Sequence, residues 1–257
     1  MAIDLSGVNS AVYFTILEGR EDPNYNDLAR MPVDLAIVSP FVTQAQDGSA
    51  GPLSADMVRE LKTGGSHEKL LFGYHGFGNL WLTAGEVAAA QTQLTWDSDL
   101  DGQPDADAPD WLGPANVAFS VPHFEGPAYR TDAGVYPEYY VKAWHPDWLS
   151  YIKGRIDQFA DVGLDGIFLD VLDVANIYST NPIHDIPGVD PIHDVYQKMG
   201  AALQDLRAHI ETFHPEFGLV INASVTDDLF ATNPGLAQEL DGMLGENQSF
   251  SYSGNSK

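Results

Sequence analysis

Two acidic residues stand where short apolar runs of this sequence end, and their types suit acid–base or nucleophilic chemistry. Asp170 directly follows the run Gly166 to Leu169, and Glu246 follows Gly242 to Leu244. Carboxylates at the ends of different strands can face each other across the mouth of a barrel. Such a pair supplies the nucleophile or base and the proton donor that glycoside hydrolysis needs. Asp173 is placed to orient the substrate or the pair. A structural acid at a barrel rim is the alternative for Asp170 and Glu246, and a loop cap is the alternative for Asp173.

Aromatic and amide side chains also lie at or near the expected strand ends. Aromatic faces stack on sugar rings, and an asparagine amide hydrogen-bonds sugar hydroxyls. The candidates for substrate binding are Tyr13, Tyr74, His75, Trp144, Asn222 and Tyr252. Packing in the core or at the rim is the alternative for each of them.

An acidic loop at residues 97–105 has the spacing of a calcium-binding loop, D-x-D-x-D-G-x-x-D. Hard carboxylate and carbonyl oxygens at this spacing suit Ca²⁺, and a glycine at the sixth position permits the sharp turn. The predicted ligands are Asp97, Asp99, Asp101, Gln103 and Asp105. The twelfth position is Ala108 rather than the glutamate of an EF-hand, which weakens the match to that motif. We expect a structural Ca²⁺ because of the oxygen ligands, with a solvated acidic loop as the alternative.

The elements that must position these residues follow from the apolar spacing. Pro146 and Asp147 mark a helix start, and apolar residues then recur at helical spacing until Gly163. Further helices are predicted after Ser54, after Thr83 and over residues 195–213. Strands are predicted at residues 11–17, 33–39, 69–75, 166–169, 218–223 and 242–246.

The alternation of apolar strands with helices predicts an α/β fold, a (β/α)8 TIM-type barrel with its chemistry at the strand ends. About six barrel strands are recognisable, so either the barrel is incomplete at the C-terminus, the chain is a fragment, or strands lie hidden in a long loop insertion around residues 95–137. We find no internal repeat or linker and expect a single domain over residues 1–257.

The composition narrows the classes of partner. The 257 residues include 37 acidic residues against 12 Lys and Arg, a formal net charge of −25, which argues against nucleic acid and anionic membrane surfaces. There is no cysteine, which excludes disulfides and thiol chemistry. No apolar run has transmembrane length, and residues 1–6 lack the features of a signal peptide. The eight histidines show no recognisable metal-binding spacing.

Several segments resemble the signature of glycoside hydrolase family 114, the endo-α-1,4-polygalactosaminidases and their barrel relatives. They are YYVKAWHPDW at 139–148 with GLDGIFLDVLD at 163–173, KLLFGYHGFG at 69–78, DWLGPAN at 110–116 and GMLGE at 242–246. The resemblance implies a barrel that cleaves an α-linked polysaccharide containing galactosamine or N-acetylgalactosamine. It also implies Asp170 as nucleophile and Glu246 as acid/base, a retaining mechanism and an extracellular setting.

The chain departs from the family pattern where Asn79 follows Gly78 instead of an acidic pair, and in the calcium-like insertion. Two other functions therefore stay open. One is a non-catalytic, calcium-stabilised carbohydrate-binding surface module. The other is a polysaccharide deacetylase or lyase on the same barrel.

Overall fold

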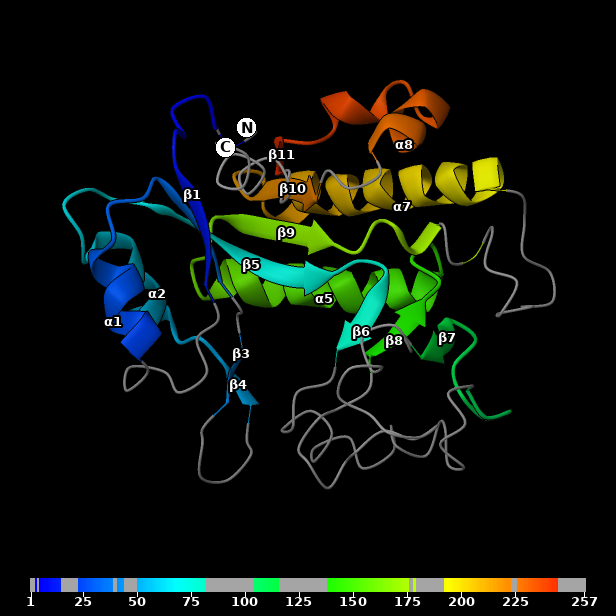
Figure 1. Ribbon diagram of the computed structural model, residues 1–257, viewed down its shortest axis with the longest axis horizontal. Helices are drawn as coiled ribbons and strands as arrows, with labels where there is room; N and C mark the ends of the chain where they lie inside the picture. The colour runs from blue at the N-terminus through cyan, green and yellow to red at the C-terminus, as the bar shows by residue number, and fades with distance from the viewer. Residues whose placement is uncertain are drawn as a thin grey trace, which may run out of the picture.

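The computed structural model describes residues 3, 5–14, 23–38, 41–43, 50–81, 104–115, 138–175, 178, 192–222 and 226–244. The main element is a curled parallel sheet in the order β1-β2-β5-β9-β10-β11, with helices on its outside (Figure 1). Its strands are Ala11–Phe14, Leu35–Val38, Leu70–Gly76, Gly166–Asp170, Gly218–Asn222 and Gly242–Leu244. The described part of the chain thus supplies a half-barrel of six strands, where a closed barrel has eight.

The helices are α1 (Pro23–Arg30), α2 (Ala55–Thr63), α5 (Pro146–Asp161), α7 (Ile192–Phe213) and α8 (Thr226–Thr232), with the short 3₁₀ helix η4 (Leu236–Gln238). None of the helices in the described ranges is long and apolar enough to cross a membrane. The helix predicted after Ser54 is confirmed as α2, and the Ser54 side chain caps it by accepting a hydrogen bond from the Met57 amide. The helix predicted after Thr83 lies outside the described residues.

Helix α5 forms as its sequence predicts. Proline occupies the first turn, where a missing amide hydrogen has no cost, and the His145 ring accepts a hydrogen bond from the Asp147 amide. The buried face consists of Trp148, Leu149, Ile152, Ile156 and Phe159. Beyond the helix, Gly163 has a φ of +89°, a left-handed conformation that glycine adopts without a steric penalty.

Short antiparallel strands outside the half-barrel were not predicted. Strands β6 (Asn79–Trp81), β8 (Glu138–Val141) and β7 (Leu112–Ala115) form one small sheet, and β3 (Phe41–Thr43) pairs with β4 (Ala50–Pro52). Strand β7 lies in the segment in which the sequence shows no period. The strands of the small sheet are held by partners distant in sequence, which local patterns do not record.

The strands of the half-barrel bury both faces, which explains their continuous apolar runs. The outward residues Leu71, Ile167, Leu169, Leu219 and Ile221 belong to the core shared with the helices. The inward residues Leu35, Ile37, Phe72, Phe168 and Val220 form a second cluster. Ile3, Leu5 and Val8, from the start of the chain, pack against that inner cluster.

Gly73 of β5 faces the Phe159 ring of α5. A Cβ atom there would come within 2.6 Å of two carbons of the Phe159 ring. We expect Gly73→Ala to lower the free energy of unfolding by about 1–3 kcal/mol, because the added methyl overpacks this interface. Gly154→Ala is the control, since a Cβ on that glycine of α5 meets no atom within 4 Å.

Equilibrium unfolding in urea measures both variants. Gly154→Ala should raise the free energy of unfolding by about 0.5–1 kcal/mol, because alanine is the better helix former. A Gly73→Ala protein as stable as wild type would show that the ring is not held against the strand.

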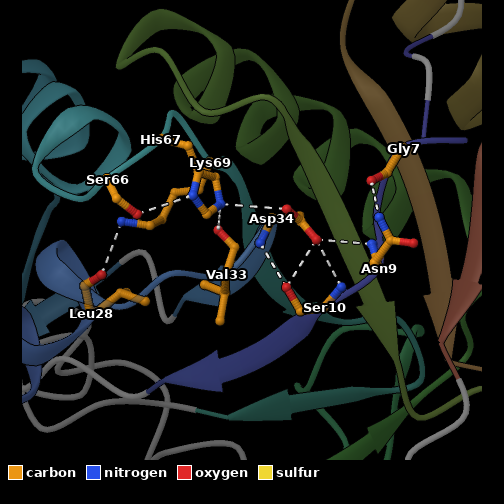
Figure 2. Close-up of polar contacts among 9 residues, drawn as sticks. All are labelled: Gly7, Asn9, Ser10, Leu28, Val33, Asp34, Ser66, His67 and Lys69. Carbon is orange, nitrogen blue, oxygen red and sulfur yellow. Dashed lines mark hydrogen bonds and ion pairs between the residues drawn. The ribbon is translucent and has the colours of Figure 1, made fainter.

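A buried lysine fastens α1 and α2 to the sheet. Lys69 is 1% exposed, and its Nζ donates to the carbonyls of Leu28, Ala29 and Leu61 at 3.1, 3.0 and 2.9 Å. Figure 2 shows the bond that joins it to Leu28 at the end of α1. Desolvation lowers the pKa of Lys69. Its three bonds supply a donor to carbonyls near the ends of both helices, and the Leu28 carbonyl also accepts from the Met31 amide.

Asp34, the residue before β2, binds the backbone of the segment that precedes β1. Its Oδ2 accepts bonds from the amides of Asn9 and Ser10 and from the Ser10 hydroxyl, each at 2.9 Å (Figure 2). These bonds lower the pKa of Asp34, and the bond from the Asn9 amide has the largest effect. The carboxylate thereby fixes the segment that leads into β1.

A buried ion pair joins α7 to the last two strands. Arg207 Nη1 lies 2.8 Å from Asp241 Oδ2, and these side chains are 9% and 3% exposed. The same carboxylate oxygen accepts a 2.8 Å bond from the Leu219 amide at the start of β10. Arg207 also pairs with Glu211 at 3.2 Å, but the Glu211 side chain is 61% exposed.

Candidate functional site

Three predicted site residues meet at the carboxyl ends of adjacent strands. Tyr74, Asp170 and Asn222 come from β5, β9 and β10. Gly76 is the register partner of Asp170, and Leu169 pairs with Ile221, so these strand ends are level. Each of the three lies two residues beyond an inward residue of its own strand, and side chains two apart on a strand lie on the same face. The inward residues are Phe72, Phe168 and Val220, so all three site residues lie on the inner face. This is the edge of a barrel at which chemistry is usually found.

Asp170 is held there by three hydrogen-bond donors. Oδ2 accepts from the Tyr74 hydroxyl at 2.8 Å, and Oδ1 accepts from the Asn222 amide at 2.8 Å and from the Val171 backbone amide at 2.7 Å. Asn222 is 4% exposed, whereas Asp170 is half-buried and remains in contact with solvent. The carboxylate orientation is therefore fixed by groups on three elements.

The pattern of these bonds distinguishes the two oxygens of Asp170. An ionised carboxylate offers about four lone pairs, two on each oxygen. Among the described residues, Oδ1 receives two donors and Oδ2 receives one. Oδ2 therefore keeps a lone pair with which it can attack a carbon atom or accept a proton.

The backbone at Asp170 is also constrained. Val171 has a φ of 59°, a left-handed conformation that a β-branched residue rarely adopts and that costs on the order of 1–3 kcal/mol. The Phe77 amide donates to the Asp170 carbonyl at 2.8 Å. A Cβ on Gly78 would lie 2.2 Å from the Val171 carbonyl oxygen, so only glycine permits this approach. The turn after β5 thus closes over the turn after β9.

Asp173 lies in the same loop, three residues beyond Asp170. The residue is solvent-exposed, yet partial desolvation of its carboxyl group raises its pKa, and the negative charge of Asp170 raises it further. Asp173 therefore holds a proton to a higher pH than an ordinary aspartate. It is a group near Asp170 that can hold or give up a proton.

His75 lies on the opposite face of β5 from Tyr74. It is 9% exposed, and its ring lies 5.8 Å from that of Trp148 and 5.7 Å from that of Tyr151, both on α5. Desolvation lowers the pKa of His75 to about 4, so the ring is neutral at pH 7. The structure does not bring His75 together with Asp170, because successive side chains of a strand alternate between faces.

Trp144 packs within the loop between β8 and α5. Its ring meets the Tyr178 ring edge-on at 5.4 Å, and Lys198 Nζ lies 5.9 Å from its centroid. Trp144 is half-buried and packs against the core that the sheet shares with the helices. For Tyr13 the structure describes only the backbone, which pairs with Ile37.

The remaining predicted site residues lie outside the described residues: Glu246, Tyr252, Asp97, Asp99, Asp101 and Gln103. Their roles stay predictions. Asp105 is described, and its carbonyl accepts the Ala108 amide in a turn at 3.0 Å. Of the groups that hold Asp170, sequence reasoning missed Val171, Phe77 and Gly78. The first two act through their backbones, which no sequence pattern marks.

Comparison with known proteins identifies the fold. No family model matches the chain, and no curated protein matches it. The glycoside hydrolase domain of PelA from Pseudomonas aeruginosa is similar in structure, with a TM-score of 0.52 and 15% identity, covering 90% of this chain and 65% of that one. Ega3 of Aspergillus fumigatus, solved with galactosamine, gives a TM-score of 0.51 and 13% identity, covering 98% of this chain and 73% of that one.

These similarities show that the chain has a fold found in glycoside hydrolases. The chain spans 65% of the length of the PelA domain. At these identities the likeness concerns the fold alone, and activity has to be argued from the site.

Proposed function

We propose that this protein is an endo-acting glycoside hydrolase of the family 114 type. Its substrate in this proposal is an α-linked polysaccharide containing galactosamine or N-acetylgalactosamine. The observation that carries the proposal is Asp170, held at the mouth of the half-barrel by Tyr74, Asn222 and the Val171 amide, with one Oδ2 lone pair left over among the described contacts. Support for the sugar comes from the family resemblance and from the similarity to Ega3, solved in complex with galactosamine.

In the proposed mechanism Asp170 Oδ2 attacks the anomeric carbon while Glu246 protonates the departing glycosidic oxygen. The covalent glycosyl-enzyme is then hydrolysed by a water that Glu246 deprotonates, and the configuration is retained. Leu244, the last residue of β11, is the register partner of Asn222, so Glu246 follows a strand adjacent to the Asp170 site. This relation supports Glu246 as the second carboxylate.

The net charge favours a cationic polymer. A formal charge of −25 attracts the ammonium groups of a partly deacetylated galactosaminan and repels anionic polysaccharides. Polymers of this kind are encountered outside cells, and we propose an extracellular setting.

Product analysis in H₂¹⁸O tests the reaction class. A partly deacetylated α-1,4-galactosaminan is incubated with the protein, and the products are analysed by mass spectrometry. We expect shorter oligomers, each carrying one ¹⁸O at its new reducing end. Unsaturated ends would indicate a lyase, acetate release without shortening a deacetylase, and binding without any product a carbohydrate-binding module. Each of these three results contradicts the proposed hydrolase.

We also propose that the loop at residues 97–105 binds a structural Ca²⁺ through Asp97, Asp99, Asp101, Gln103 and Asp105. An ion that binds only the folded protein raises its Tm. Adding 1 mM CaCl₂ after EGTA treatment should therefore raise the Tm of the wild type by several degrees, and Asp101→Asn should abolish most of that rise. An equal response of both proteins would assign the effect to another site.

A further inference from the structure

A second cluster of ionisable side chains lies between α5 and α7. His209 Nε2 donates to Asp157 Oδ1 at 2.7 Å, and His214 Nε2 donates to the same oxygen at 2.8 Å. The three ligand atoms lie within 4.8 Å of one another. Two imidazoles and one carboxylate thus converge on a single point, although they come from two helices far apart in sequence.

The rings are fixed by their surroundings, and the carboxylate is open to solvent. The His209 ring packs on the Phe213 ring at 4.9 Å, and the His214 ring lies 6.3 Å from the Phe217 ring. The histidine side chains are 14% and 21% exposed, whereas that of Asp157 is 47% exposed. The donor atoms are therefore preorganised, with a path by which an ion can enter.

The electrostatic setting favours a cation. Asp157 lies in the last part of α5, His209 lies near the end of α7, and His214 directly follows that helix, so the negative ends of both helix dipoles are near the cluster. Neither helix has a basic residue in its last turn.

We propose that Asp157, His209 and His214 bind a divalent transition metal ion of the zinc type. Two nitrogen ligands and one oxygen ligand suit Zn²⁺ or Co²⁺, with water in the fourth position. The metal takes the place of the two Nε2 protons that now face Asp157. Ligands about 2.0–2.1 Å from a tetrahedral ion lie roughly 3.3 Å apart, which small side-chain rotations provide.

This ion would lie away from Asp170 and would join two helices. Helices α5 and α7 lead into β9 and β10, so the cluster lies at the amino ends of these strands, away from Asp170 at their carboxyl ends. An ion shared by the two helices would fasten them to each other. The proposal does not depend on the proposed glycosidase activity.

The test is calorimetric titration of tag-free protein with ZnCl₂ at about pH 7.5, where imidazole is mostly neutral. CaCl₂ at 1 mM is present to occupy oxygen-rich sites. We expect one equivalent to bind the wild type, and a rise in Tm on the order of 5 °C at Zn²⁺ near 100-fold the Kd. Bound Co²⁺ should give the visible absorption of a four-coordinate ion.

The variants Asp157→Asn and His209→Gln keep side-chain volume and should each weaken binding by at least about 10- to 100-fold, since even outer-shell substitutions have such effects. His193→Ala and Asp205→Asn are the matched controls, because neither residue is a proposed ligand and their side chains are 64% and 48% exposed. His193 lies at the start of α7, whereas Asp205 lies one turn before His209 and pairs with Lys153 of α5, so Asp205→Asn tests the loss of a negative charge near the cluster. Both controls should bind Zn²⁺ as the wild type does.

Either of two results would overturn the proposal. One is that the folded wild type binds no Zn²⁺ at 100 µM, which would mean that the three side chains form hydrogen bonds only and hold no metal. The other is that Asp157→Asn and His209→Gln bind as tightly as the controls, which would place the ion elsewhere. Circular dichroism without metal confirms that each variant is folded.

Discussion

Asp170→Asn is expected to abolish polysaccharide hydrolysis, with a loss of about 10³-fold or more in kcat/KM. The neutral amide is a far poorer nucleophile than a carboxylate, so the step that forms the covalent intermediate fails. The fold should persist, because an asparagine side chain fits the same space and its oxygen can still accept from the Val171 amide. Reducing-end release from the galactosaminan measures the activity, and the Tm confirms folding.

Asp205→Asn is the matched control, an aspartate of α7 whose side chain is 48% exposed and pairs with Lys153. It should retain full activity. Asp170→Ala with added azide then separates a nucleophile from a base, because azide can attack the anomeric carbon from the vacated side and release a glycosyl azide. Activity of Asp170→Asn within about twofold of wild type would remove Asp170 from the mechanism, whatever the polymer.

Asp241→Ala is expected to give the largest loss of stability among single substitutions in the helix–strand contacts, about 3–5 kcal/mol in the free energy of unfolding. The change leaves the Arg207 guanidinium without its buried partner and deprives the Leu219 amide of its acceptor. A buried charge and a buried donor without partners both carry desolvation penalties. Urea unfolding monitored by fluorescence measures the change.

Glu211→Gln is the matched control for Asp241, since both acids pair with Arg207. Its side chain is 61% exposed, and exposed ion pairs contribute about 0–1 kcal/mol. Equal losses for the two variants would mean that burial does not decide the strength of the Arg207 contacts. A loss below about 1 kcal/mol for Asp241→Ala would show that water reaches Arg207 when the carboxylate is removed.

The sequence predicted the central elements of the half-barrel because their signals are local. The run 146–170 showed a proline helix start, a helical apolar face, a glycine stop and an apolar strand that ends on Asp170, and the structure confirms each. Asn222 and Tyr74 were also placed at strand ends, and both contact Asp170. In a parallel sheet, the carboxyl ends of neighbouring strands lie along one edge. Placing each residue at a strand end is therefore enough to predict that the residues lie close together.

Other features depend on contacts that no local pattern records. The small sheet of β6, β8 and β7 and the left-handed Val171 are held by residues distant in sequence. The Asp157–His209–His214 cluster joins two helices, so the spacing of histidines alone could not reveal it. His75 is different: strand alternation forbids adjacent residues from sharing a face, and Tyr74 already occupied the inner one.

The packing of Ile3, Leu5 and Val8 on the inner face has a consequence for how the chain folds. A Cβ on Gly218 would meet Ile3, and one on Gly242 would meet Leu5, so residues near the start of the sequence contact β10 and β11 within the half-barrel. Such contacts have very large sequence separation, and the entropy of closing that loop is lost before their burial is gained. During synthesis, the first residues must therefore wait for β10 and β11.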